Sequence, residues 1–176
     1  GMEQALFAEY EERFREIEGA TRITEKIALI PITGSKGFAT PMGNEFLFKN
    51  DLPDNFSHEV AILVEHSPGE YTVISPCTHN GILNVLECCR EHLDLSGKGE
   101  IKYFVGGLHY VDYLQGCGEN KEAAQIIGTA HKLKELYPAL KVFSGHCTCS
   151  AAGELIQSVL GENYSTFCTG TTISCI

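Results

Sequence analysis

The spacing of hydrophobic and polar positions predicts a helix and then a strand at the start of the chain. Residues 3–18 predict an amphipathic helix, because apolar side chains recur three or four positions apart among charged ones. These apolar residues are Leu6, Tyr10, Phe14 and Ile17. The run 26–32 predicts a strand, and Pro31 must lie at its end or at a sheet edge because proline has no N–H to donate. The Gly-, Pro- and Asn-rich stretch 33–57 predicts a long loop, which in a compact domain is commonly functional or mobile.

The pattern beyond residue 58 predicts a hairpin and then strands that alternate with helices. The apolar runs 59–65 and 71–75 flank a turn-rich spacer, which predicts the hairpin. Helical spacing and apolar runs then alternate, predicting helices at 82–93, 120–137 and 150–160 and strands at 101–107 and 140–145. The β-branched tail 164–175 predicts one or two short strands. This alternation is typical of an α/β fold, or α+β when described by its layers.

Length, composition and charge narrow the class of protein. A chain of 176 residues with 43% hydrophobic content predicts a single domain over residues 1–176, with residues 1–19 as an N-terminal helix. The formal net charge of −10, with no cluster of basic residues, excludes a surface for nucleic acid. Because no apolar run approaches the roughly 18 residues that a membrane span needs, we expect no membrane segment and a cytoplasmic protein.

The chain has eight cysteines, which we expect to be reduced thiols because no secretory signal precedes them. Cys88 and Cys89 lie in a helical pattern and are expected in the core. Cys77, Cys147 and Cys149 lie beside histidines, so they could be metal ligands. An alternative is cysteine catalysis, in which a neighbouring imidazole activates a thiolate.

Three predicted strands each end just before a histidine: "YTVISPCTH" leads to His79, "IKYFVGGLH" to His109 and "LKVFSGH" to His146. Neighbouring strands that run the same way place their carboxyl ends on one edge of the sheet, where open α/β sheets bind ligands. Histidine is the commonest metal ligand among titrating side chains, so the three histidines predict a metal site. Zinc is favoured, with iron and manganese as alternatives.

The remaining histidines are not expected to belong to this metal site. His66, His92 and His131 are expected to be solvated, and His58 to be structural. Glycines 106, 107 and 145 predict close approach of the backbone to a ligand or a tight turn. Asn80 and Gly81 stand at the start of a predicted helix, whose free N–H groups could bind an anionic group of a small-molecule substrate.

The motifs "SPCTHNGILN", "VGGLHY" and "SGHCTC", in this order with a helix between each, resemble the C-terminal half of metallo-β-lactamase-fold hydrolases. The subgroup resembled is related to dihydropterin ribofuranosyl-aminobenzene phosphate synthase, and the resemblance covers residues 20–176. It implies part of a four-layer αββα sandwich with a metal site at one edge. It also implies that His79, His109 and His146 ligate metal or touch substrate.

Four further residues are predicted to bind the substrate. By this resemblance Thr78 and Thr148 match neighbours of the ligands, and Asn80 and Cys147 complete the set. The implied activity is hydrolysis of an ester or phosphoester by a metal-bound hydroxide.

The family's H-x-H-x-D-H loop has no match in this sequence. The chain therefore begins, in effect, in the middle of the fold, which predicts a truncated hydrolase that is inactive alone. The alternative is a catalytically silent binding or assembly module. The missing half also supplies the second sheet of the sandwich, so we expect an exposed apolar sheet face and pairing as a homo-oligomer or with a partner chain.

Overall fold

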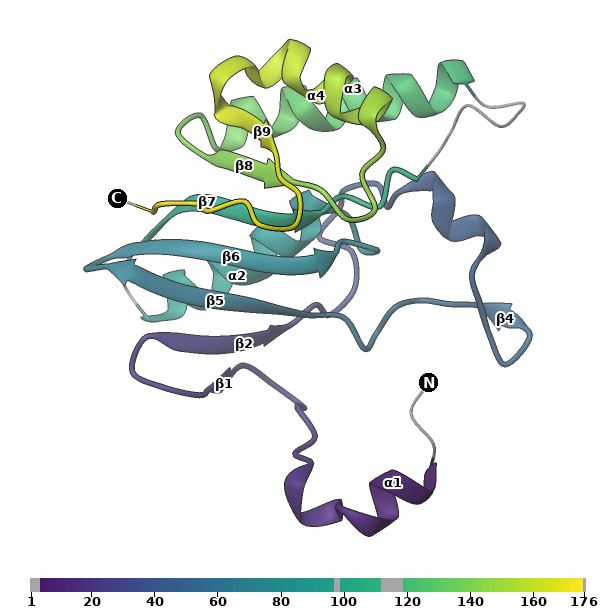
Figure 1. The fold of residues 1–176 in the computed structure, drawn as a ribbon, viewed down its shortest axis with the longest axis vertical. Helices are drawn as coiled ribbons and strands as arrows, with labels where there is room; N and C mark the ends of the chain where they lie inside the picture. Colours follow the sequence, from purple (N-terminus) through teal and green to yellow (C-terminus); the bar gives the residue numbers. More distant parts are fainter. Residues whose placement is uncertain (1–3, 97–98, 112–118, 176) are drawn as a thin grey trace.

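A mixed β-sheet forms the centre of the computed structural model, which describes residues 4–96, 99–111 and 119–175 (Figure 1). Its strands follow the order β1-β2-β5-β6-β7-β8-β9. Their bounds are β1 Thr21–Arg22, β2 Ile27–Pro31, β5 Val60–Ser67, β6 Glu70–Cys77, β7 Glu100–Gly107, β8 Lys141–Ser144 and β9 Tyr164–Thr166. The strands from β1 to β6 pair antiparallel, and those from β6 to β9 pair parallel. Three neighbouring strands, β6, β7 and β8, therefore end at the same edge.

Three helices connect the parallel strands and cover one face of the sheet. They are α2 Ile82–Ser96, α3 Glu119–Leu136 and α4 Ser150–Leu160. Each crossover leads to the next strand in the same direction across the sheet, and right-handed crossovers then place all three helices on one face. The contacts agree, because α2 packs on β2, β5 and β7, α3 packs on α4, and α4 packs on β9.

The core lies between these helices and a row of apolar side chains that crosses the sheet in register. From β2 to β9 this row is Ala28, Leu63, Val73, Phe104, Val142 and Tyr164. All but the half-buried Ala28 are buried, and all pack in one hydrophobic cluster with the helices. Because each buried apolar side chain contributes roughly 1.5–3 kcal/mol, this row stabilises the packing of the sheet against its helical layer by several such contributions.

The opposite face of the sheet carries a second apolar row, which no helix of the described residues covers. Its members in register are Leu29, Ile62, Ile74, Val105 and Phe143, and all are half-buried. The C-terminal tail runs over part of this face (Figure 1), and the hydroxyl of Thr72 lies 3.7 Å from the Cys175 sulfur. The face is therefore apolar and only partly covered.

The segment 33–57 leaves the sheet at the end of β2 and returns before β5, carrying short elements of its own. These are the 3-10 helix η2 Met42–Phe46 and the strands β3 Phe48–Lys49 and β4 Leu52–Pro53. Its first part is fixed on α2, because the Asn84 side chain accepts from Lys36 N–H and donates to the Phe38 carbonyl. The β3–β4 hairpin extends away from the sheet in Figure 1.

The predicted α/β class, hairpin and alternation of strands and helices are confirmed, and Pro31 does end its strand. The N-terminal prediction is wrong in extent, because helix α1 covers only Gln4–Glu9 and is followed by a 3-10 turn, η1 Glu11–Arg13. Its apolar side chains remain exposed, with Leu6 at 41% and Phe14 at 43%, so no tertiary packing stabilises a longer helix.

One smaller expectation also changes, and the prediction of one or two short strands in the tail is confirmed. His66 is not solvated: it lies in β5, where its Nδ1 is 3.0 Å from the Thr72 hydroxyl and its ring meets the edge of Tyr103. The tail contains one described strand, β9, after a 3-10 turn, η4 Gly161–Asn163. That residues 1–176 form a single domain stays a prediction.

Phe104 provides the test of this packing, because it lies in the centre of the core row and is fully buried. Replacing Phe104 by Ala is expected to lower the free energy of unfolding by about 3–5 kcal/mol through lost burial and a cavity. Chemical denaturation monitored by circular dichroism measures this change. The matched control is Phe48→Ala, where the side chain is 62% exposed and a loss below about 0.5 kcal/mol is expected. Equal losses in the two variants would contradict the assignment of the core.

Candidate metal centre

The segments that follow β6, β7 and β8 are joined to one another by hydrogen bonds at the carboxyl edge of the sheet. Thr78 N–H donates to the Gly107 carbonyl over 3.0 Å, and the Thr78 hydroxyl donates to the same oxygen. Leu108 N–H in turn donates to the Thr148 hydroxyl over 2.9 Å. These bonds hold the three segments in one cluster, as the sequence predicted for the exits of neighbouring parallel strands.

His79 and His109 meet within this cluster. Their ring centroids lie 4.0 Å apart, and Phe56 stacks on the other side of His79 at 4.1 Å. Asn44 fixes the same residue from η2: its Oδ1 lies 3.3 Å from His79 Nδ1, and its amide donates to the His79 carbonyl. The His79 ring is therefore held between an aromatic ring, an amide and a second imidazole.

Two thiols lie beside the histidines. The Sγ atoms of Cys77 and Cys147 are 2.9 Å apart, and Cys77 Sγ is 3.2 Å from His109 Nδ1. The backbone N–H of His109 donates to Cys147 Sγ over 3.2 Å. The described residues thus contain two groups whose possible ligand atoms lie within 4.8 Å of one another: Cys77 with His79 and His109, and Cys77 with His146 and Cys147. Cys77 belongs to both groups.

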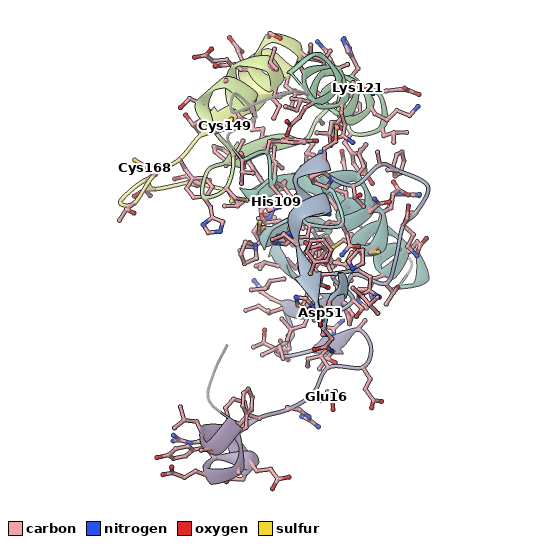
Figure 2. All side chains as sticks on the ribbon, turned by 90° about the vertical axis from the view of Figure 1, so that its right-hand side faces the viewer. Glu16, Asp51, His109, Lys121, Cys149 and Cys168 are labelled. Atoms are coloured by element: carbon pink, nitrogen blue, oxygen red, sulfur yellow. The ribbon has the colours of Figure 1, made fainter. Side chains whose placement is uncertain are left out.

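The structure does not bring the three predicted histidines into one group. His79 and His109 lie together, whereas His146 is exposed and lies with the two thiols. His109 is 7% exposed, and its Nε2 is buried without a hydrogen-bond partner. Figure 2 shows His109 where the ribbons of the sheet and of η2 approach each other. A buried imidazole nitrogen without a partner is an available ligand atom, since buried polar atoms are normally satisfied.

His109 and His146 also share an unusual backbone conformation. Their φ angles are +53° and +57°, in the left-handed region that favours glycine. Such angles cost free energy for a residue with a side chain and cluster at functional sites. The conformation lets the chain turn sharply just after β7 and β8.

Burial and hydrogen bonding set the charges of this cluster. The hydrogen bond from Cys77 lowers the pKa of the Cys147 thiol to about 4, and the contacts with His109 act in the same direction. The same bond, followed by burial, raises the pKa of Cys77, so the two sulfurs hold one proton between them. Burial, and then His109, lowers the pKa of His79. A thiolate and a neutral imidazole are the protonation states that ligate metals.

The predicted substrate-binding residues lie at different depths. Thr78 is buried and bonded to β7, and Thr148 bonds to Leu108 and to the Ser144 hydroxyl. Both connect backbone segments. Cys147 is half-buried within the ligand groups. Cys149 begins α4 as its N-cap and accepts from Ala152 N–H.

The backbone N–H and the side-chain amide of Asn80 both bind another residue of the protein, Glu59. Glu59 Oε2 accepts from both the backbone N–H and the amide of Asn80, at 2.8 and 2.6 Å. Glu59 is 8% exposed, and its other oxygen, Oε1, has no partner. The carboxylate therefore fills the start of α2, which the sequence suggested as a position for an anionic substrate group. Burial raises the pKa of Glu59 against these hydrogen bonds, which favour its charged form.

Sequence reasoning missed the contributions of Asn44, Phe56 and Glu59. The first two come from the long loop 33–57, whose length and composition did indicate function, but a side chain in an irregular segment has no periodicity that would place it. At these glycines the backbone approaches other segments of the protein closely, while the predicted approach to a ligand stays a prediction. A Cβ at Gly107 would lie 2.5 Å from Cys147 Sγ, and one at Gly145 would lie 2.6 Å from the Phe167 carbonyl oxygen.

Comparison with solved structures finds a similar fold. The chain superposes on the crystal structure of Tm1679, a metal-dependent hydrolase of the beta-lactamase superfamily, with a TM-score of 0.66 and 21% sequence identity. The chain has a β-lactamase-like fold. The superposition covers 92% of this chain but 58% of Tm1679, so this chain spans little more than half of that structure. No protein-family model and no curated protein matches the sequence.

Among the described residues, no helix combines the length and the apolar character needed to cross a bilayer.

The pH dependence of protein stability tests the buried environment of Glu59. Its raised pKa means that the folded state binds this proton more tightly than the unfolded state. The stability of the wild type relative to Glu59→Gln should therefore fall as pH rises from the ordinary glutamate pKa through the raised one, by up to about 1.4 kcal/mol per pH unit. Above the raised pKa the difference should be constant.

Chemical denaturation between pH 4 and pH 8 measures this difference. The control is Glu154→Gln, at an exposed position of α4, for which a nearly flat difference is expected. A relative stability of the wild type that increases with pH would show that Glu59 is stabilised as a charged group, contrary to the effect of its burial.

Proposed function

We propose that this chain is a metal-dependent hydrolase whose divalent metal binds where β6, β7 and β8 end. The observation that carries the proposal is the pair of Cys and His groups that share Cys77, with possible ligand atoms within 4.8 Å. The similar structure, Tm1679, is a metal-dependent hydrolase of the beta-lactamase superfamily. The three histidine motifs further favour the subgroup related to dihydropterin ribofuranosyl-aminobenzene phosphate synthase.

The residues present fit a metal. His109 offers a buried Nε2 that has no other partner, and its Nδ1 lies against a thiol. The donor set combines imidazole and sulfur, which favours zinc, with iron and manganese as alternatives. We assign Cys77, His79 and His109 to the buried group, and His146 and Cys147 to the exposed group, which also uses Cys77.

The bound metal would supply a Lewis acid and lower the pKa of a water molecule, the chemistry needed to hydrolyse an ester or phosphoester. The chain's own residues orient and shield the site. Asn44 sets the rotation of the His79 ring through its hydrogen bond to Nδ1, and Phe56 covers one face of that ring. A small-molecule substrate would approach from the side of His146, the exposed member of the cluster. Because no H-x-H-x-D-H motif is present, we propose that the chain is inactive as a hydrolase when it is alone.

A specific observation favours a second candidate function, that of an assembly module. The in-register row from Leu29 to Phe143 presents half-buried apolar side chains on the sheet face opposite the helices. Sheets with two apolar faces are normally packed between layers, and a large apolar patch marks an interface. We propose that a second copy of this chain packs on this face.

His109→Ala should test the metal centre, because it removes the ligand that is most deeply buried. We expect the wild type to hold at least one equivalent of zinc per chain and the variant to bind zinc roughly tenfold or more weakly. Metal analysis by mass spectrometry is made on protein prepared without a chelator or a metal-affinity tag, alongside turnover of a chromogenic phosphodiester. The control is His131→Ala, an exposed histidine of α3, which should leave metal content unchanged. A wild type that takes up no metal, or equal uptake by both variants, would reject the metal centre.

Ile62→Lys should test the assembly function, because Ile62 lies within the apolar row. A chain of 19.3 kDa that pairs through this face should run as a dimer in light scattering, and the buried lysine should convert it to a monomer. The control is Leu52→Lys, which removes an apolar side chain that is 68% exposed on β4. A wild-type monomer, or a dimer that both substitutions leave intact, would count against a second copy as the occupant.

A further inference from the structure

The contact between Cys77 and Cys147 joins two strands that are not neighbours. Cys77 ends β6, and Cys147 follows β8, while β7 lies between them. Seventy positions separate the two residues in sequence. Their Sγ atoms nevertheless lie 2.9 Å apart, so the fold brings two thiols together across an intervening strand.

Gly107 makes this contact possible. It is the β7 residue paired with Cys77, and a side chain there would lie directly between the two sulfurs' segments. A Cβ at Gly107 would be 2.5 Å from Cys147 Sγ and 2.7 Å from the Pro76 carbonyl oxygen, both closer than real contacts. The missing side chain therefore leaves the space in which the thiols meet.

We propose that Cys77 and Cys147 are a modification site, where a peroxide oxidises the two thiols to a reversible disulfide. The sulfur atoms need to approach by only about 0.9 Å to reach the bond length of a disulfide. Both residues are half-buried rather than enclosed, so a molecule as small as hydrogen peroxide can reach them. Cys88 and Cys89, by contrast, are buried in the core.

The reaction balances with one peroxide molecule. The Cys147 sulfur, which accepts the His109 N–H, attacks one peroxide oxygen as the thiolate; the O–O bond breaks, and the other oxygen leaves as hydroxide, which takes a proton from solvent to become water. Cys147 is then a sulfenic acid. The Cys77 sulfur attacks the Cys147 sulfur, the S–O bond breaks, and the oxygen leaves as a second water with the proton of Cys77. Two electrons pass from the two sulfurs to the peroxide, and a dithiol reductant returns them.

The disulfide would also change the metal site, an extension that rests on the proposed function. A disulfide sulfur is no longer a thiolate and is a poor metal ligand. The buried group would keep two imidazoles, and the exposed group would keep only His146. Oxidation should therefore release a bound metal, and metal bound to the thiolates should slow oxidation.

The experiment treats the full chain with one equivalent of hydrogen peroxide and measures its intact mass and its unreduced peptides. We expect the loss of the mass of two hydrogen atoms, a peptide linking Cys77 to Cys147, and complete reversal by dithiothreitol. In Cys77→Ser the link should be lost, and dimedone, which labels sulfenic acids, should label Cys147 at least tenfold more than in the wild type. The matched control is Cys168→Ser, an exposed cysteine at the outer edge of the molecule in Figure 2, which should keep the link.

A wild type that shows no mass loss, or that links any other pair of cysteines, overturns the modification site. The measurement on the wild type requires neither a bound metal nor a folded variant, so it tests the modification site independently of the proposed function. The metal extension is tested by loading the wild type with zinc before the peroxide. A disulfide that forms without release of zinc overturns the extension alone, whereas a chain that takes up no zinc counts against the proposed function and leaves the disulfide result standing.

Discussion

The candidate centre depends on the close approach of the ends of β6, β7 and β8. This approach leaves no room for a side chain at Gly106 or at Gly107. A Cβ at Gly106 would lie 1.7 Å from the Ser75 carbonyl oxygen, and one at Gly107 would meet Cys147 Sγ at 2.5 Å. Any larger residue at either position would force β7 away from its neighbours. The cluster of imidazoles and thiols therefore follows from backbone packing, and its side chains converge because the strand ends do.

The loop that closes the cluster is held by polar groups at the start of α2. Asn84 bonds to the early part of the loop, and Asn80 bonds to Glu59 and to the Phe56 carbonyl at its end. These bonds fix both ends of an irregular segment that has little regular structure of its own. Glu59 Oε2 accepts two of these bonds, from the backbone N–H and the amide of Asn80, so Glu59 anchors the end of the loop. The placement of Phe56 over His79 follows from that anchor.

Much of the fold could be predicted from sequence, because periodicity and strand alternation are local signals. The carboxyl ends of β6, β7 and β8 were predicted to share an edge, and their pairing confirms it. The grouping at that edge could not be predicted. Whether His146 would join His79 or the thiols depends on a left-handed turn after β8, and nothing in the residue itself signals that turn. The length of the N-terminal helix was predicted wrongly for a related reason, since helical spacing gives no stability without a surface to pack on.

The left-handed backbone conformation at positions 109 and 146 makes histidine less favourable in free energy than glycine there. Glycine adopts such angles freely, and asparagine tolerates them better than most residues, so either would relieve the chain at both positions. Natural variation should then record whether the chemistry is under selection. Homologous chains that have lost it should drift toward glycine or asparagine at the two positions. Chains that still use it should keep histidine against that conformational bias.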